Sequence, residues 1–253
     1  MPFLDHLEEL RWRILWSLLA LAIGFAVGLV LVLHYEFISI IQRPIAPYLH
    51  GAKLVYTHPG EPFNIAMSVS FAVGAVLAAP VILYQLWLFL APALYQHEKR
   101  VAMSVLLGAT LLFICGVCVS FFVLLPLTLS FLLGFQSASL QPMITAGNYF
   151  GFATGMSLAL GGVFELPILI VALTAFGIVQ PRTLVRYRRH AFAACFLASA
   201  VITPGDVLSA TLVLLGPLYG LYELSILLSY GVHRRRERRL LADAHAAAAE
   251  PAT

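Results

Sequence analysis

Charged residues are scarce in this sequence. Only 11% of its 253 residues are Asp, Glu, Lys or Arg, whereas 61% are apolar. Soluble domains carry about 25% charged residues, so a surface that faces water on all sides is excluded. Residues 14–33, 62–97 and 101–164 contain no charged side chain. Each of these stretches exceeds the roughly 18 residues that indicate a membrane span, so the sequence predicts an integral membrane protein.

The sequence also lacks the short motifs of common hydrolases and nucleotide-binding enzymes. It contains no G-x-S-x-G, no H-E-x-x-H and no Gly-rich phosphate loop. His97-Glu98 is followed by Lys99 and Arg100 rather than by a second histidine, and the apolar segments contain no paired aspartates. We therefore expect no catalytic residues, no metal site and no cofactor, and we also expect no nucleic-acid partner.

Cysteine is rare, with three residues, all of them in apolar segments. Cys115 and Cys118 have the C-x-x-C spacing of redox and metal sites, but that motif needs a soluble context to carry such chemistry. Inside a span, the pair is interpreted as two small apolar residues one helical turn apart.

The apolar segments predict an all-α, polytopic membrane protein, because backbone groups inside a bilayer must form hydrogen bonds within their own segment. Six transmembrane helices are expected at residues 12–33, 65–90, 103–133, 149–176, 191–202 and 207–228. The last two helices are short, since a helix from Arg189 to Pro204 rises roughly 22 Å and the hydrocarbon core is about 30 Å thick.

These spans form one transmembrane domain over residues 1–231. Residues 232–253 are first basic and then rich in alanine, and we expect this tail to be disordered.

The distribution of Lys and Arg predicts the orientation. These residues concentrate in the cytoplasmic segments of membrane proteins. With the N-terminus inside, all but two of the 15 basic residues fall in cytoplasmic segments, and only Arg43 and Lys53 lie outside. Six spans then place both termini on the cytoplasmic side.

Glu165 is the acidic residue that lies clearly inside a predicted span. An ionised carboxylate at the bilayer centre costs about 2.5–3.5 kcal/mol on insertion scales, so such residues commonly mark functional sites. Pro167 has no backbone N–H, so a carbonyl group one turn earlier loses its helical partner. We therefore expect a polar break in this span. A neutral Glu165 that forms a structural hydrogen bond with a neighbouring helix is the alternative.

A second candidate site lies on the cytoplasmic side, where Glu8, Glu9 and Glu98 stand among basic residues. A carboxylate there matches the planar fork of a guanidinium group. The ordinary alternative is that Glu9 pairs with Arg13 along its helix and that Glu98 pairs with Arg100 or faces solvent. From the residues alone this alternative is favoured.

The segment Thr203-Pro204-Gly205-Asp206 predicts a tight turn between the last two spans, with Pro and Gly where a type II turn requires them. Asp206 then precedes a helix, where an N-cap role is expected.

Taken together, the motifs resemble the TatC family, the signal-peptide-receptor subunit of the twin-arginine protein translocase. The matching stretches are His6-Leu7-Glu8-Glu9-Leu10-Arg11, Ala79-Pro80-Val81-Ile82-Leu83-Tyr84-Gln85, Phe89-Leu90-Ala91-Pro92-Ala93-Leu94-Tyr95, His97-Glu98-Lys99-Arg100, Phe164-Glu165-Leu166-Pro167 and Thr203-Pro204-Gly205-Asp206-Val207. They follow one another over nearly the whole chain.

The resemblance implies a receptor for the Arg-Arg pair of twin-arginine signal peptides on folded cargo proteins, without catalysis. It assigns the arginine-binding surface to Glu9 and Glu98 with Phe89 nearby, and includes Glu8 and Arg11 of the same motif. That assignment outweighs the ordinary pairing favoured above. It also makes Glu165, together with Thr203 and Asp206 of the turn, the contact for a partner's transmembrane helix.

The implied partners are TatA- and TatB-like single-span proteins in the bacterial inner membrane, with export driven by the proton motive force. Several copies of the chain are expected in the receptor complex. The alternative function is a proton-coupled secondary transporter that uses Glu165. It is disfavoured because the sequence shows no internal repeat and one intramembrane carboxylate.

Overall fold

The computed structural model describes residues 2–49, 51, 53–90, 99–134, 143–202 and 208–249. Within these ranges the secondary structure is helical, with one isolated β-bridge between Val55 and Thr145. The helices are α1 (Pro2–His34), α2 (Phe37–Gln42), η1 (Ala46–Tyr48), α3 (Glu61–Leu90), α4 (Lys99–Val119), η3 (Ser120–Leu124), α5 (Leu125–Gly134), α6 (Ala146–Val163), α7 (Leu166–Phe176), α8 (Pro181–Arg186), α9 (Arg188–Ile202) and α10 (Leu208–Ala249). The predicted all-α class is confirmed for the described residues.

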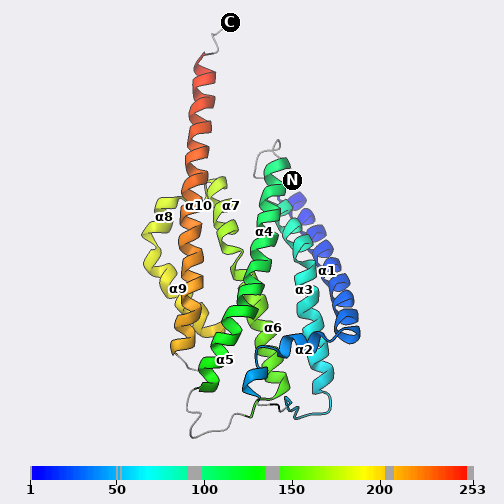
Figure 1. The fold of residues 1–253 in the computed structure, drawn as a ribbon. Helices are drawn as coiled ribbons and strands as arrows, with labels where there is room; N and C mark the ends of the chain where they lie inside the picture. Colours follow the sequence, from blue (N-terminus) through cyan, green and yellow to red (C-terminus); the bar gives the residue numbers. More distant parts are fainter. Residues whose placement is uncertain are drawn as a thin grey trace.

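The long helices run side by side in alternating directions (Figure 1). The start of α1 and the end of α10 lie at one end of the bundle, which we call the terminal end. The short helix α2 and the starts of α3 and α6 lie at the opposite end, which we call the distal end. The C-terminal part of α10 extends past the other helices at the terminal end.

Five helical segments are long and apolar enough to cross a membrane: Leu7–His34, Glu61–Phe89, Leu106–Gly134, Ala146–Ala175 and Thr211–Arg234. The predicted span 191–202 falls in α9, which has 15 residues and therefore rises roughly 22 Å. This helix is shorter than the hydrocarbon core of about 30 Å. The count of six spans therefore stays a prediction.

Proline explains why two predicted spans are built from more than one helix. In the span 103–133, α4 passes through the π-helical turn η3 into α5, which carries Pro126 in its first turn. Proline lacks an N–H group and crowds the preceding turn, and a widened π turn relieves both constraints. In the span 149–176, α6 ends at Val163 and α7 begins with Pro167 in its first turn, where a missing N–H is tolerated.

The C-terminal segment differs from the sequence-based expectation. A disordered tail was expected from residue 232, but α10 continues to Ala249. Ala and Arg dominate this segment, and both are among the residues that favour helix most strongly.

Close backbone contact joins α1 to α3. A Cβ atom added at Gly24 or Gly74 would overlap the backbone of the opposite helix, and one added at Gly28 would overlap the carbonyl oxygen of Ser70. Small residues four apart permit such approach between membrane helices. Shape complementarity therefore holds this pair together.

Hydrogen bonds between side chains, or from side chains to backbone, connect α10 with its neighbours. The hydroxyls of Thr174 in α7 and Ser229 in α10 are 2.8 Å apart, and both side chains are fully buried. The Tyr222 hydroxyl donates to the carbonyl of Leu184 at 2.8 Å, linking α10 to α8. At the edge of this region, Arg188 of α9 donates to a carboxylate oxygen of Glu223 at 2.6 Å.

Glu61 joins the distal starts of α3 and α6. Its carboxylate accepts hydrogen bonds from the backbone N–H of Gly147 at 2.6 Å and of Thr57 at 2.7 Å. Beside it, the N–H of Ala146 donates to the carbonyl of Val55 at 2.7 Å. The carboxylate thus satisfies a backbone donor that the first turn of α6 would otherwise leave unpaired.

Candidate functional site

A groove of about 250 Å³ runs between α1 and the terminal end of α3. Leu10, Arg13 and Ser17 line it from α1, while Gln85 and Phe89 line it from α3. The groove is otherwise apolar and lies near the terminal end, where most of the basic residues are also located. The structure thus brings the predicted Phe89 next to the α1 motif.

Glu9 forms an ion pair and a hydrogen bond with Arg13 one turn along α1. This is the pairing that we considered as the ordinary alternative from sequence. The Glu9 side chain remains 36% exposed, whereas Arg13 is largely buried at 17%. Because Arg13 lines the groove, the pair holds the Glu9 carboxylate beside it.

The other predicted residues of this site are only partly placed. Glu8 and Arg11 are exposed on α1. Glu98 lies outside the described residues, and so do Thr203 and Asp206 of the predicted turn. The arginine-binding role of these residues therefore stays a prediction.

Glu165 lies at the junction of α6 and α7, as its predicted polar break requires. Its backbone carbonyl accepts hydrogen bonds from Ile168 at 3.1 Å and Leu169 at 3.0 Å. Its side chain is half-buried and lines a cavity of about 130 Å³ between α3, α4, α6 and α7. Trp87 of α3 lines the same cavity and was not among the residues predicted for a site. The sequence feature that could have identified Trp87 is its indole N–H within an apolar span, since a buried indole N–H usually has a hydrogen-bond partner.

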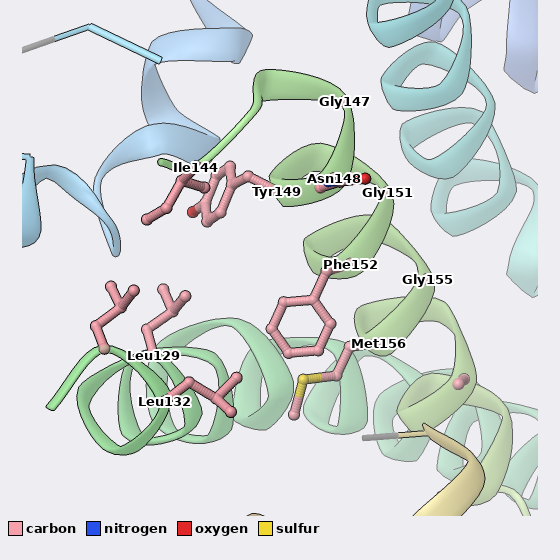
Figure 2. Close-up of a pocket in the computed structure, with 12 residues that line it drawn as sticks. Leu129, Leu132, Ile144, Gly147, Asn148, Tyr149, Gly151, Phe152, Gly155 and Met156 are labelled. Carbon is pink, nitrogen blue, oxygen red and sulfur yellow. The ribbon is translucent and has the colours of Figure 1, made fainter. Parts of the chain in front are cut away.

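A larger hollow of about 650 Å³ lies between α5 and the distal part of α6 (Figure 2). Leu129 and Leu132 face it from α5, and Phe152 and Met156 face it from α6. Its lining contains no charged side chain and none of the predicted site residues.

Metal binding is not indicated by the described part of the chain. No three His, Cys, Asp or Glu side chains gather there closely enough to hold an ion.

Comparison with known proteins identifies the family. Residues 5–216 match the family model described as Sec-independent protein translocase protein (TatC). The chain belongs to the TatC family. A TatC protein from Koribacter versatilis is 39% identical over 245 residues, covering 94% of this chain and 89% of the relative. The TatC proteins of Aquifex aeolicus and Escherichia coli K12 are 38% and 34% identical, covering 94% and 93% of this chain and 98% and 92% of their own lengths.

The fold agrees with this assignment. The solved structure described as "Crystal Structure of Twin Arginine Translocase Receptor- TatC" superposes with a TM-score of 0.80 at 36% identity. The match covers 90% of this chain and 99% of that one. TatC membership makes the chain a component of the Sec-independent protein translocase, a role in protein transport in which other translocase subunits take part. It gives no support to the alternative of a proton-coupled secondary transporter.

Proposed function

We propose that this chain is the receptor subunit that binds twin-arginine signal peptides, with the groove between α1 and α3 as the place where binding begins. A solved relative of similar fold is described as a twin-arginine translocase receptor. The observation that carries the proposal is the position of the Glu9–Arg13 pair beside a groove lined by Phe89.

A signal peptide requires two kinds of contact, one for its arginine pair and one for its apolar residues. Carboxylates bind guanidinium groups through charge-assisted and often bidentate hydrogen bonds, so Glu9 and Glu98 are suited to the arginine pair. The apolar groove wall around Phe89 is suited to the hydrophobic residues of a signal peptide. Arg13 holds the Glu9 carboxylate in place until the peptide arrives.

The terminal end of the bundle faces the cytoplasm in this proposal. Arg11, Arg13, Lys99 and the basic residues from Arg182 to Arg189 all lie in segments at that end. Arg43 and Lys53 lie in segments at the distal end. This asymmetry favours the cytoplasmic location of both termini in a bacterial inner membrane.

Single-span TatA- and TatB-like proteins are the proposed partners, and Glu165 with the turn around Thr203 and Asp206 is their proposed contact. Glu165 is suited to this because a half-buried carboxyl group in a span favours a polar partner. Several copies of the chain then assemble in one receptor complex, which exports folded cargo with energy from the proton motive force.

The test is binding of a twin-arginine signal peptide to the purified chain in lipid nanodiscs, compared with the same peptide carrying two lysines. We expect the arginine peptide to bind at least tenfold more tightly, because lysine cannot form the bidentate contact. Glu9→Gln and Glu98→Gln should each weaken binding of the arginine peptide about tenfold or more.

Glu36→Gln is the matched control, since Glu36 is an exposed carboxylate at the opposite, distal end. Its affinity should equal that of the unmodified chain. Equal binding of the two peptides, or equal effects of Glu9→Gln and Glu36→Gln, would contradict the proposal.

A further inference from the structure

The cavity beside Glu165 has walls that are almost entirely apolar. Leu83 of α3, Leu106 of α4 and Ile168 of α7 are among the side chains that line it. Two polar side chains also reach it, Trp87 from α3 and Glu165 from the junction of α6 and α7.

Each of these polar side chains has a buried atom without a hydrogen-bond partner among the described residues. The atoms are Nε1 of Trp87 and Oε1 of Glu165. Buried polar atoms are nearly always hydrogen-bonded, and the exceptions call for an explanation. The indole N–H only donates and a carboxyl oxygen accepts, so the two groups are complementary but are not bonded to each other.

The cavity has room for the missing partner. Its volume is about 130 Å³. One water molecule occupies roughly 30 Å³ in the liquid, and a buried water typically forms two to four hydrogen bonds.

We propose that water fills this cavity and bridges the indole N–H of Trp87 to the carboxyl group of Glu165. Trp87 is then a positioning residue that directs the Glu165 side chain toward α3. This inference goes beyond the receptor function and does not depend on it, because it concerns the chain in a bilayer without peptide or partner.

Fluorescence of Trp87 tests the proposal directly. The chain has three tryptophans, and Trp12 and Trp16 lie on the exposed face of α1, at 57% and 55% exposure. The Trp12→Phe/Trp16→Phe variant therefore leaves Trp87 as the single reporter. It is measured in nanodiscs that contain lipid and no other protein.

Substitutions at Glu165 are then made in this background. Glu165→Leu removes the polar end of the bridge, so we expect the Trp87 emission maximum to move to shorter wavelength. The gain in intensity on transfer from H₂O to D₂O should also be lost. Glu165→Gln keeps a hydrogen-bonding group of the same size and should preserve both properties. Glu36→Gln, at the distal end, serves as the control and should change neither.

Identical emission and D₂O response in the parent and in Glu165→Leu would overturn the proposal, because the cavity would then be dry. A shift that appears only after a single-span partner is added would also overturn it, since a partner side chain would be the occupant.

A second measurement guards against variants that unfold. Thermal unfolding is compared for Trp87→Phe, Glu165→Leu and the double variant. A water bridge predicts that the second substitution lowers the unfolding temperature less when the first is already present. Additive shifts would contradict a shared bridge.

Discussion

The first and the last long helices of the bundle are attached to their neighbours in different ways. α1 meets α3 through glycines that bring the two backbones together. α10 meets α7, α8 and α9 through hydroxyl, carbonyl and carboxylate hydrogen bonds. Lipid is as apolar as leucine, so membrane helices associate through close packing and polar contacts rather than through the hydrophobic effect. The first contact should therefore be sensitive to added atoms, and the second to lost polar atoms.

The largest effect is expected when atoms are added to the α1–α3 contact. Gly28→Leu places a side chain against the backbone of α3 at Ser70. We expect it to lower the free energy of unfolding by about 3 kcal/mol, at the upper end of overpacking costs. Thermal unfolding in detergent measures the change. Gly220→Leu is the control, because a Cβ atom at Gly220 meets open space, and an effect as large as that of Gly28→Leu would contradict the proposed contact.

At the distal end, the carboxylate of Glu61 joins the start of α3 to the start of α6 by hydrogen bonds to backbone N–H groups. Glu61→Ala removes the acceptor for the N–H groups of Thr57 and Gly147. A loss of stability smaller than that of Gly28→Leu is expected, because the substitution acts like the removal of a helix cap. Chemical unfolding provides the measurement, and a neutral result would show that water replaces the carboxylate. Glu36→Ala should cost little, since its side chain makes no cap hydrogen bond.

A smaller effect is expected from the buried hydroxyl pair that joins α7 to α10. Thr174→Val keeps the shape of the side chain and removes its hydroxyl, which leaves that of Ser229 without this partner. The expected cost is about 1 kcal/mol, in the range measured for hydrogen bonds between membrane helices. A double-mutant cycle with Ser229→Ala should show coupling. Independent effects of the two substitutions would mean that the hydroxyl pair does not stabilise this contact.

The smallest effect is expected from the exposed ion pair. The side chains of Arg188 and Glu223 are 46% and 31% exposed. Solvent and salt screen such pairs, so Arg188→Gln should cost about 0.5 kcal/mol or less, and the difference should shrink in high salt. Unfolding at two salt concentrations checks this. A large loss of unfolding free energy that does not change with salt would show that the Arg188–Glu223 pair stabilises the protein as a buried contact does.

Local features of the sequence predicted the helical spans and one of their breaks. Long uncharged runs identify the spans, and the pair Glu165 and Pro167 predicts the junction of α6 and α7. The extent of α10 was missed because the basic and alanine-rich composition of its end was given more weight than the high helix propensity of its alanines.

Contacts between distant segments could not be predicted from the sequence. The spacing of Gly24 and Gly28 is visible in the sequence, but nothing local shows that α3 packs against them. The position of Trp87 beside Glu165 likewise depends on how four helices meet. For the candidate site, the sequence presented the Glu9–Arg13 pair as an alternative, and the structure adds the groove beside it.

The hydrogen bond from Gly147 to Glu61 also constrains the order of events during synthesis. The two residues are 86 positions apart, and both lie at the distal end of the bundle. A ribosome adds roughly 5–20 residues per second, so on the order of ten seconds separates their synthesis. The α1–α3 contact can form in that interval, whereas the Glu61 carboxylate remains hydrated until α6 has been inserted. We expect cysteines placed at positions 55 and 145, which the β-bridge pairs beside this hydrogen bond, to cross-link only in nascent chains long enough to expose both, which makes this distal contact a marker for a half-inserted chain.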